Sequence, residues 1–214
     1  KQKNVDTGMG VERTTAVLNN KKSVYETDAF LEVYKKISEL SSSDDDTSKR
    51  IICDHVRAAT FLLGDQRCIV PSNVDQGYVL RKLIRRAIRN AKKIGINEPF
   101  LVSLSEIIIN QYSKDYSELK ENQNFIEKYL GLEEEKFYKI INEGQKESFK
   151  EIEKITDVNE KVNVLDIEVL RAAKTSFDLY QSHGYPMEMF VEDIKEKKGI
   201  EESLSEKICD DVGK

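Results

Sequence analysis

The chain has 214 residues, of which 34 are Lys or Arg and 39 are Asp or Glu, giving a formal net charge of −5. A charged fraction of 34%, with only 10 glycines and 3 prolines, is typical of a helical protein and excludes collagen-like, low-complexity and β-sandwich classes. No apolar run approaches the roughly 20 residues of a membrane span, and residues 1–4 lack the apolar stretch of a signal peptide. We expect a cytoplasmic protein that does not enter a membrane.

The predicted elements are all helices, so we expect an all-α fold. Apolar spacing predicts helices over 11–19, 28–40, 49–63, 76–94, 100–112, 116–154, 169–181, 187–198 and 203–211. Thr47 or Ser48 is expected to cap the third helix, after a polar loop of serines and aspartates. The stretch over 116–154 is expected to break near Gly131, its acidic residues over 133–160 are expected to form a solvated face, and a polar joint is expected over 152–163.

The helix over 76–94 is strongly basic and ends at Gly95, a typical helix stop. Residues 76–97 contain seven basic residues and no acidic one, whereas the remaining 27 basic and 39 acidic residues of the chain give a net charge of −12. Its apolar residues form one stripe, and the cations lie on or beside the opposite face. This concentration of positive charge indicates a polyanionic partner, with an ordinary solvated helix face as the alternative.

The cysteines and histidines indicate no metal site. Cys53, Cys68 and Cys209 form no CxxC pair, which indicates a reduced, intracellular chain without a structural zinc ion. His55 and His183 have no cysteine or acidic residue at ligand spacing, so a metal site or a catalytic histidine pair is disfavoured.

A glycine-containing turn precedes the first helix, with the sequence Asp6-Thr7-Gly8-Met9-Gly10-Val11-Glu12-Arg13. It lacks the third glycine of a dinucleotide-binding motif and the lysine of a P-loop, so the two glycines alone are a weak signal. Arg13, however, lies at a helix start beside exposed backbone N–H groups, which suits a triphosphate. A tight turn capped by Asp6 is the alternative.

This turn resembles motif 3 of the class II aminoacyl-tRNA synthetases, in the form found in the alanyl-tRNA synthetase family. Three further blocks resemble that family: IICDHVRAA at 51–59, PSNVDQGYVLRKLIRRA at 71–87 and FDLYQSHGYP at 177–186. The resemblance implies the end of a class II catalytic domain over 1–20, a helical tRNA-recognition subdomain over 21–155 and a second helical subdomain over 156–214.

The resemblance also implies an activity for the parent enzyme, which would activate alanine with ATP and Mg²⁺ and transfer it to tRNA(Ala). It implies that Arg13 grips an ATP phosphate, that Asp6 holds the alanine ammonium group, and that Gly8 and Gly10 allow a close backbone approach. The family's first two catalytic motifs and its zinc-dependent editing region are absent from the sequence. We therefore expect this chain alone not to activate alanine and to hold no zinc, and we expect residues 1–20 to be partly helical and poorly anchored.

The rest of the chain is implied to recognise the tRNA acceptor stem. The resemblance implies that Asn73 reads a G·U wobble pair, and its amide, which offers both a donor and an acceptor, suits an unusual base-pair edge. An ordinary turn asparagine is the alternative. Contacts to acceptor-stem phosphates are implied for Arg81, Lys82, Arg85, Arg86 and Arg89. For Arg86, a pair with an acidic neighbour is the alternative.

The second reader of the wobble pair departs from the family pattern, which has Asp where this chain has Gln181. A glutamine accepts a hydrogen bond through a neutral amide oxygen, without the added strength that a negative charge gives. We therefore expect Gln181 to face the wobble pair and to distinguish a G·U pair less strongly than an aspartate does. Asp178, one helical turn earlier, is the alternative reader.

Two other functions remain open alongside this one. The chain could be a free-standing helical RNA-binding module, or a helical scaffold whose basic helix docks an acidic protein partner. The scaffold predicts no preference for structured RNA over other polyanions. The sequence leaves the oligomeric state open, and it favours core or hinge positions over base stacking for Tyr78, Tyr180 and Tyr185.

Overall fold

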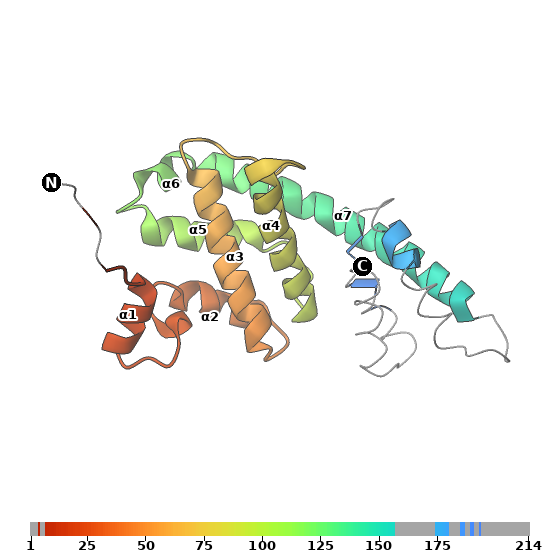
Figure 1. Cartoon of the computed structure of the whole chain (residues 1–214), viewed down its shortest axis with the longest axis horizontal. Helices are drawn as coiled ribbons and strands as arrows, with labels where there is room; N and C mark the ends of the chain where they lie inside the picture. Colours follow the sequence, from red (N-terminus) through yellow and green to blue (C-terminus); the bar gives the residue numbers. More distant parts are fainter. Residues whose placement is uncertain are drawn as a thin grey trace. The chain divides into compact units, whose positions relative to one another are not determined.

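The computed structural model describes residues 4, 7–156, 174–179, 185–186, 189–190 and 193. Every regular element in these ranges is a helix, which confirms the predicted all-α fold (Figure 1). The elements in chain order are α1 (Val11–Leu18), η1 (Val24–Glu26), α2 (Leu31–Leu40), α3 (Asp46–Gly64), α4 (Asp75–Lys93), α5 (Leu101–Tyr112), α6 (Ser117–Glu121) and α7 (Gln123–Thr156). None of the described helices combines the length and the hydropathy that a membrane span requires.

The chain divides into two compact units, residues 1–135 and residues 136–214. The first unit contains α1 to α6 and the beginning of α7, and the second contains the remainder of α7. The division falls inside α7, whereas the sequence indicated a boundary after residue 155. The three domains expected from the sequence stay a prediction.

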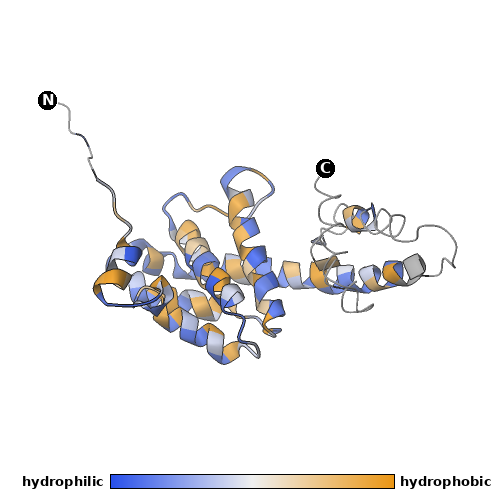
Figure 2. Cartoon of the chain, turned by 60° about the horizontal axis from the view of Figure 1, so that its bottom comes forward, coloured by the Kyte–Doolittle hydropathy of each residue, from blue (hydrophilic) through white to orange (hydrophobic). Residues whose placement is uncertain are grey.

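Helices α3 and α4 pack against each other at the centre of the first unit, and α3 also contacts α2, α5 and α6. The apolar positions that spacing predicted are buried: Ile52, Val56, Ala59 and Leu63 on α3, and Leu80, Ile84, Ala87, Ile88 and Ala91 on α4. Burying each large aliphatic side chain stabilises the fold by about 1.5–3 kcal/mol. Figure 2 shows the result as hydrophobic and hydrophilic residues alternating along the helices of this unit.

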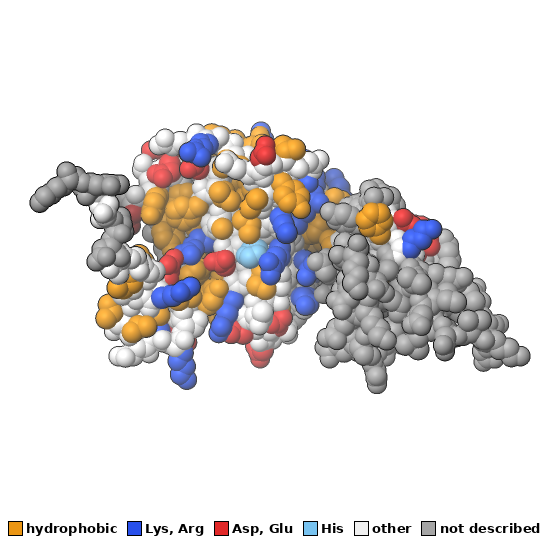
Figure 3. All heavy atoms as spheres, in the orientation of Figure 1, with side chains coloured by type: hydrophobic (Ala, Val, Ile, Leu, Met, Phe, Trp, Pro, Cys, Tyr) orange, Lys and Arg blue, Asp and Glu red, His pale blue; other side chains and the backbone are white. Residues whose placement is uncertain are grey.

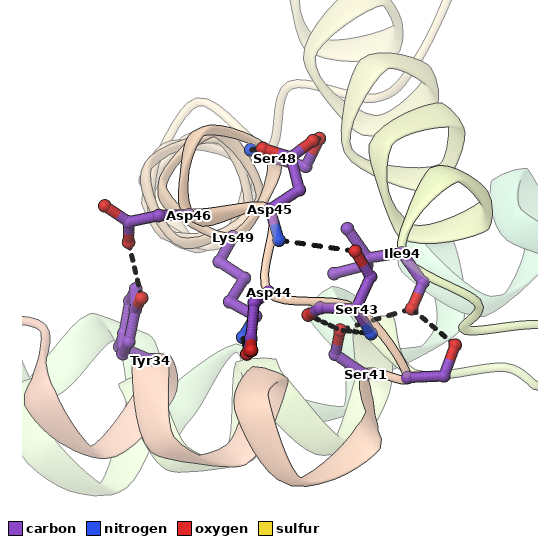
Figure 4. A network of polar contacts seen from close by, with 10 residues as sticks. Tyr34, Ser41, Ser43, Asp44, Asp45, Asp46, Ser48, Lys49 and Ile94 are labelled. Carbon is purple, nitrogen blue, oxygen red and sulfur yellow. Dashed lines mark hydrogen bonds and ion pairs between the residues drawn. The ribbon is translucent and has the colours of Figure 1, made fainter.

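The start of α3 differs from the prediction, because Asp45 is the capping residue instead of Thr47 or Ser48 (Figure 4). The Asp45 carboxylate accepts hydrogen bonds from the backbone N–H of Ser48 at 3.2 Å and from its hydroxyl at 2.6 Å. These bonds hold the pKa of Asp45 below its usual value. An aspartate cap of this kind stabilises a helix by about 1 kcal/mol, so the helix begins three residues earlier than expected.

Serines in the loop between α2 and α3, residues 41–45, form hydrogen bonds with the residue that follows α4 (Figure 4). The carbonyl oxygen of Ile94 accepts from the backbone N–H of Ser42 at 2.9 Å and from the Ser41 hydroxyl at 3.2 Å. Gly95 follows with a φ of 82°, a left-handed conformation that favours glycine. The predicted stop of the basic helix at Gly95 is confirmed, and Ser42 packs where a side chain at Gly95 would lie.

The long acidic stretch is interrupted at Asn122 and not at Gly131. Asn122 ends α6, and its amide donates to the carbonyl oxygen of Gly64 at 3.0 Å. Gly131 lies inside α7, which is continuous to Thr156 and therefore occupies the first residues of the predicted polar joint. The predicted solvated face is also wrong in part, because Glu133 and Glu134 are buried.

The second unit contains a buried polar network around Asp193. The Asp193 carboxylate accepts from the hydroxyl of Ser148 on α7 at 2.5 Å and from the hydroxyl of Tyr185 at 2.7 Å. Tyr185 is fully buried, as expected, and its ring packs against Gly144 on α7. Residues 174–179 are helical, in agreement with part of the predicted helix over 169–181. Residues 189–190 and 193 are helical as well, and the helix predicted over 203–211 lies outside the described residues.

Candidate nucleic-acid interface

Helix α4 presents an exposed stripe on the side opposite its buried residues. Six of its seven exposed positions follow helical spacing, namely Asp75, Tyr78, Val79, Lys82, Arg86 and Lys93, and the seventh is Gln76. The space-filling view shows Lys and Arg side chains gathered along the region of α4 (Figure 3). The sequence therefore produces an amphipathic helix whose apolar side faces α3 and whose charge faces outward.

Three cations of α4 have no hydrogen bond or ion pair among the described residues: Arg81, Lys82 and Arg86. Lys82 and Arg86 are exposed, and Arg81 is half-buried. We call these three residues the basic face. The alternative of an acidic partner for Arg86 finds no support in the described part of the chain. Cations that are unpaired and exposed attract an anionic ligand without first breaking an ion pair.

Arg85, by contrast, points its guanidinium at α7. Its Nε donates to Oε1 of Glu133 at 2.7 Å, and the Glu133 side chain is only 7% exposed. Arg89 is half-buried and engaged in interactions of its own. The five cations that the sequence grouped together therefore lie in two different environments.

The loop before α4 holds Asn73 at the surface. The hydroxyl of Ser72 accepts from the backbone N–H of Val74 at 3.3 Å, and the backbone N–H of Ser72 donates to the carbonyl oxygen of Gly77 at 3.0 Å. Gly77 is buried, and a side chain there would collide with Ser72 and with the Val70 carbonyl group. The loop is thus fixed around Asn73, while the Asn73 amide is exposed and forms no hydrogen bond with the described residues.

The motif 3 residues lie at the start of α1. Gly10 is the N-cap, with no side-chain cap, and Gly8, Gly10 and Arg13 are all exposed. The first backbone N–H groups of a helix without a cap are available to an anion. A side chain added at Gly8 would meet nothing within 4 Å, so this part of the chain gives no packing reason for that glycine. Asp6 lies outside the described residues.

An ion pair anchors α1 to α3. Nη1 of Arg57 donates to Oε1 of Glu12 at 3.1 Å and to the Tyr112 hydroxyl at 3.4 Å, and the Arg57 guanidinium lies 4.0 Å from the centre of the Phe30 ring. A backbone hydrogen bond lowers the pKa of Glu12, and Arg57 lowers it further. The predicted helix near residues 11–19 is confirmed, and within it only Ala16 is buried.

The structure describes only some of the residues that were predicted to read the wobble pair or to lie in the core or at a hinge. Gln181 and Tyr180 lie outside the described residues, and Asp178 is exposed on the helical segment 174–179. Tyr78, predicted to lie in the core or at a hinge, is 45% exposed and is therefore not a core residue. Its spacing of four residues from Lys82 was the available signal, because residues four apart share one face of a helix.

The described residues contain no group of three His, Cys, Asp or Glu side chains that could hold a metal ion. His55 lies on α3 with its Nδ1 3.8 Å from the Asp54 carboxylate, and the pKa of Asp54 is lowered by His55. His183 lies outside the described residues.

A family model described as tRNA synthetases class II (A) matches residues 1–208 of the chain. The chain belongs to the class II tRNA synthetases. In this class II synthetase chain, the basic face and the Asn73 loop lie within the matched region.

Curated relatives of this class II synthetase chain are named alanine–tRNA ligase. A protein from Borrelia garinii subsp. bavariensis is 46% identical over 195 residues, which cover 88% of this chain and 31% of the relative. A protein from Treponema pallidum is 41% identical over 202 residues, which cover 92% of this chain and 32% of the relative. The resemblance to the alanyl-tRNA synthetase family is confirmed, and the chain spans about a third of the length of the curated relatives it matches.

Proposed function

We propose that this chain is the part of an alanine–tRNA ligase that recognises the acceptor stem of tRNA(Ala). The whole enzyme would activate alanine with ATP in the cytoplasm and transfer it to the tRNA. The names of the relatives and the class II family model support this activity. Mg²⁺ would accompany the ATP phosphates, and the oligomeric state is left open.

The observation that carries the proposal is the basic face of α4 next to the exposed Asn73. Arg81, Lys82 and Arg86 supply unpaired positive charge along one helix, in a chain whose net charge is −5. Lys and Arg side chains bind phosphates, releasing counterions, and they position a nucleic acid without reading its sequence. The proposal rests on these three residues, because Arg85 is held by Glu133.

Base reading is assigned to Asn73, with Gln181 as the second reader and Asp178 as its alternative. An amide side chain can donate and accept at the same time, so it can match the unusual edge of a G·U pair. The fixed loop around Asn73 supports this role, because a reader that is already positioned loses little conformational entropy on binding.

The motif 3 residues are proposed to serve the ATP and alanine site of the whole enzyme. The uncapped N-terminus of α1 and the exposed Arg13 suit an ATP phosphate, and Gly8 and Gly10 leave the backbone open to close approach. Asp6 is proposed to hold the alanine ammonium group. We expect no activation of alanine by this chain alone.

The test is a titration of the chain with acceptor-stem RNA hairpins at about 50 mM and about 200 mM salt. Three phosphate contacts predict that affinity falls about 20- to 40-fold between the two concentrations. Lys82→Ala removes one contact and reduces this salt dependence, whereas Lys114→Ala, an exposed lysine outside α4, leaves it unchanged.

A free-standing RNA-binding module that borrowed the recognition region would give the same titration, so the experiment tests recognition of the acceptor stem by this chain. A preference for a G·U hairpin over a G·C hairpin supports the assigned base reading. Equal binding of both hairpins contradicts the assigned base reading. Binding of polyglutamate as tightly as the hairpins would overturn the proposal in favour of a scaffold that docks an acidic protein.

A further inference from the structure

The N-terminal end of α4 has a different surface from the rest of the helix. Three apolar side chains are exposed there: Val74 at 65%, Tyr78 at 45% and Val79 at 53%. The Tyr78 ring contacts no other aromatic ring among the described residues. Exposed apolar residues that adjoin one another indicate a binding surface more often than isolated ones do.

The chemistry of this end does not suit a phosphate. Asp75, the first residue of α4, is exposed and places a carboxylate beside the apolar residues. Its negative charge would repel a phosphate, whereas it has little effect on the uncharged face of a nucleobase. The exposed Tyr78 ring, with exposed valines at nearby positions of the chain, offers the flat, apolar surface on which unpaired bases stack.

The position of Tyr78 relative to the basic face supports the same conclusion. Lys82 lies one helical turn after Tyr78 on the same face, at a rise of about 6 Å, and Arg86 lies at a rise of about 12 Å. Asn73 immediately precedes Val74, the N-cap of the helix. A nucleic acid whose phosphates lie against Lys82 and Arg86 therefore passes the Tyr78 ring at the end of α4.

We propose that Tyr78 is a stacking platform for an unpaired nucleobase at the open end of the acceptor stem. This inference rests on the proposed function, because it assumes that an RNA stem binds along α4. It adds a residue that selects a stem with a single-stranded end over a blunt one. The occupant is a nucleobase, because the apolar surface is continuous with a row of unpaired cations.

The experiment uses the whole chain and a G·U acceptor-stem hairpin with an unpaired 3′ tail, whose first tail nucleotide is 2-aminopurine. Stacking of this base on Tyr78 quenches its fluorescence when the chain binds. Tyr78→Phe keeps the ring and should retain the quenching. Tyr78→Leu should lose the quenching and bind the tailed hairpin about 5- to 150-fold more weakly, as expected for the loss of one stacked base.

A blunt hairpin separates stacking from a general loss of structure, since Tyr78→Leu should bind it as tightly as the unsubstituted chain does. Tyr116→Leu is the matched control, because Tyr116 is also 45% exposed and lies away from α4, at the N-cap of α6. Equal quenching by the Tyr78→Leu and unsubstituted chains would overturn the inference and leave the proposed function intact. Failure of the unsubstituted chain to bind either hairpin would overturn both.

Discussion

The Nε of Arg85 on α4 lies 2.7 Å from Oε1 of Glu133 on α7, and this pair joins the basic helix to the long helix that follows it. Glu133 is 7% exposed and Arg85 is 25% exposed, so both charges are largely removed from water. Arg86, the next residue, is exposed and has no partner among the described residues. Adjacent arginines on one helix thus have different roles, one in folding and one at the surface.

We expect Arg85→Met and Arg86→Met to separate these roles. Removing Arg85 leaves a buried, unpaired Glu133 carboxylate, which should lower the free energy of unfolding by about 3 kcal/mol. Removing Arg86 should change it by no more than about 0.5 kcal/mol while weakening RNA binding. Urea unfolding and hairpin titration of both variants measure the two effects. Equal stability of the two variants would contradict the structural role of Arg85.

Glu134 should make the stability of the first unit depend on pH. Its buried carboxylate accepts from the backbone N–H of Phe100 at 3.0 Å, and burial raises its pKa from 4.5 to about 7. Between these values the folded state holds the proton and the unfolded state has lost it, so stability falls as pH rises through this window and is constant above it.

Glu134→Gln cannot ionise, so comparing it with the unsubstituted chain isolates this effect. The stability of Glu134→Gln relative to the unsubstituted chain should rise by about 2–3 kcal/mol from pH 5 to pH 8. Urea unfolding at both pH values measures the difference. A difference that stays constant with pH would show that Glu134 keeps an ordinary pKa.

Two glycines of α7 should respond in opposite directions to alanine. A side chain at Gly144 would collide with the buried ring of Tyr185, so Gly144→Ala should destabilise the second unit by about 1–3 kcal/mol. At Gly131 the nearest atom to an added side chain is Cγ2 of Val102, at 3.8 Å. Gly131→Ala should therefore be tolerated or stabilise the helix by up to about 1 kcal/mol. Thermal unfolding of the two variants tests the contrast, and similar losses would contradict it.

The cysteines should differ in reactivity. Cys53 is fully buried in α3, and burial raises the pKa of its thiol to about 12, whereas Cys68 is exposed in the loop after α3. A thiolate is the reactive form, so iodoacetamide at pH 8 should label Cys68 and leave Cys53 unmodified in the folded chain. Peptide mass spectrometry measures both sites, and urea should make Cys53 reactive. Rapid labelling of Cys53 without urea would contradict its burial.

Much of the fold follows from local patterns in the sequence. The apolar spacing of α3 and α4 identified the residues that pack together, and Gly95 identified the end of α4. The break at Asn122 was missed, because a glycine is a stronger local signal than an asparagine whose amide bonds a distant carbonyl group. Such a bond depends on tertiary structure and has no periodic signature.

The sequence identified most residues of the candidate site, but it did not show which of them are paired and which are exposed. The sequence grouped five cations of α4, and it could not show that Glu133, 48 residues after Arg85, binds one of them. Tyr78 was predicted to lie in the core or at a hinge, although its spacing from Lys82 and Arg86 places it on the exposed stripe. Counting helical positions from the buried Leu80 would have identified its exposure.

The central claim is that Asn73 reads the wobble pair of an acceptor stem bound along α4. The most direct measurement is a double-mutant cycle, in which the unsubstituted chain and Asn73→Ala are each titrated with G·U and G·C hairpins. We expect the unsubstituted chain to prefer G·U by about 1–3 kcal/mol. We expect Asn73→Ala to bind both hairpins equally while keeping its salt dependence. A G·U preference that survives in Asn73→Ala, or that is absent from the unsubstituted chain, would contradict the claim.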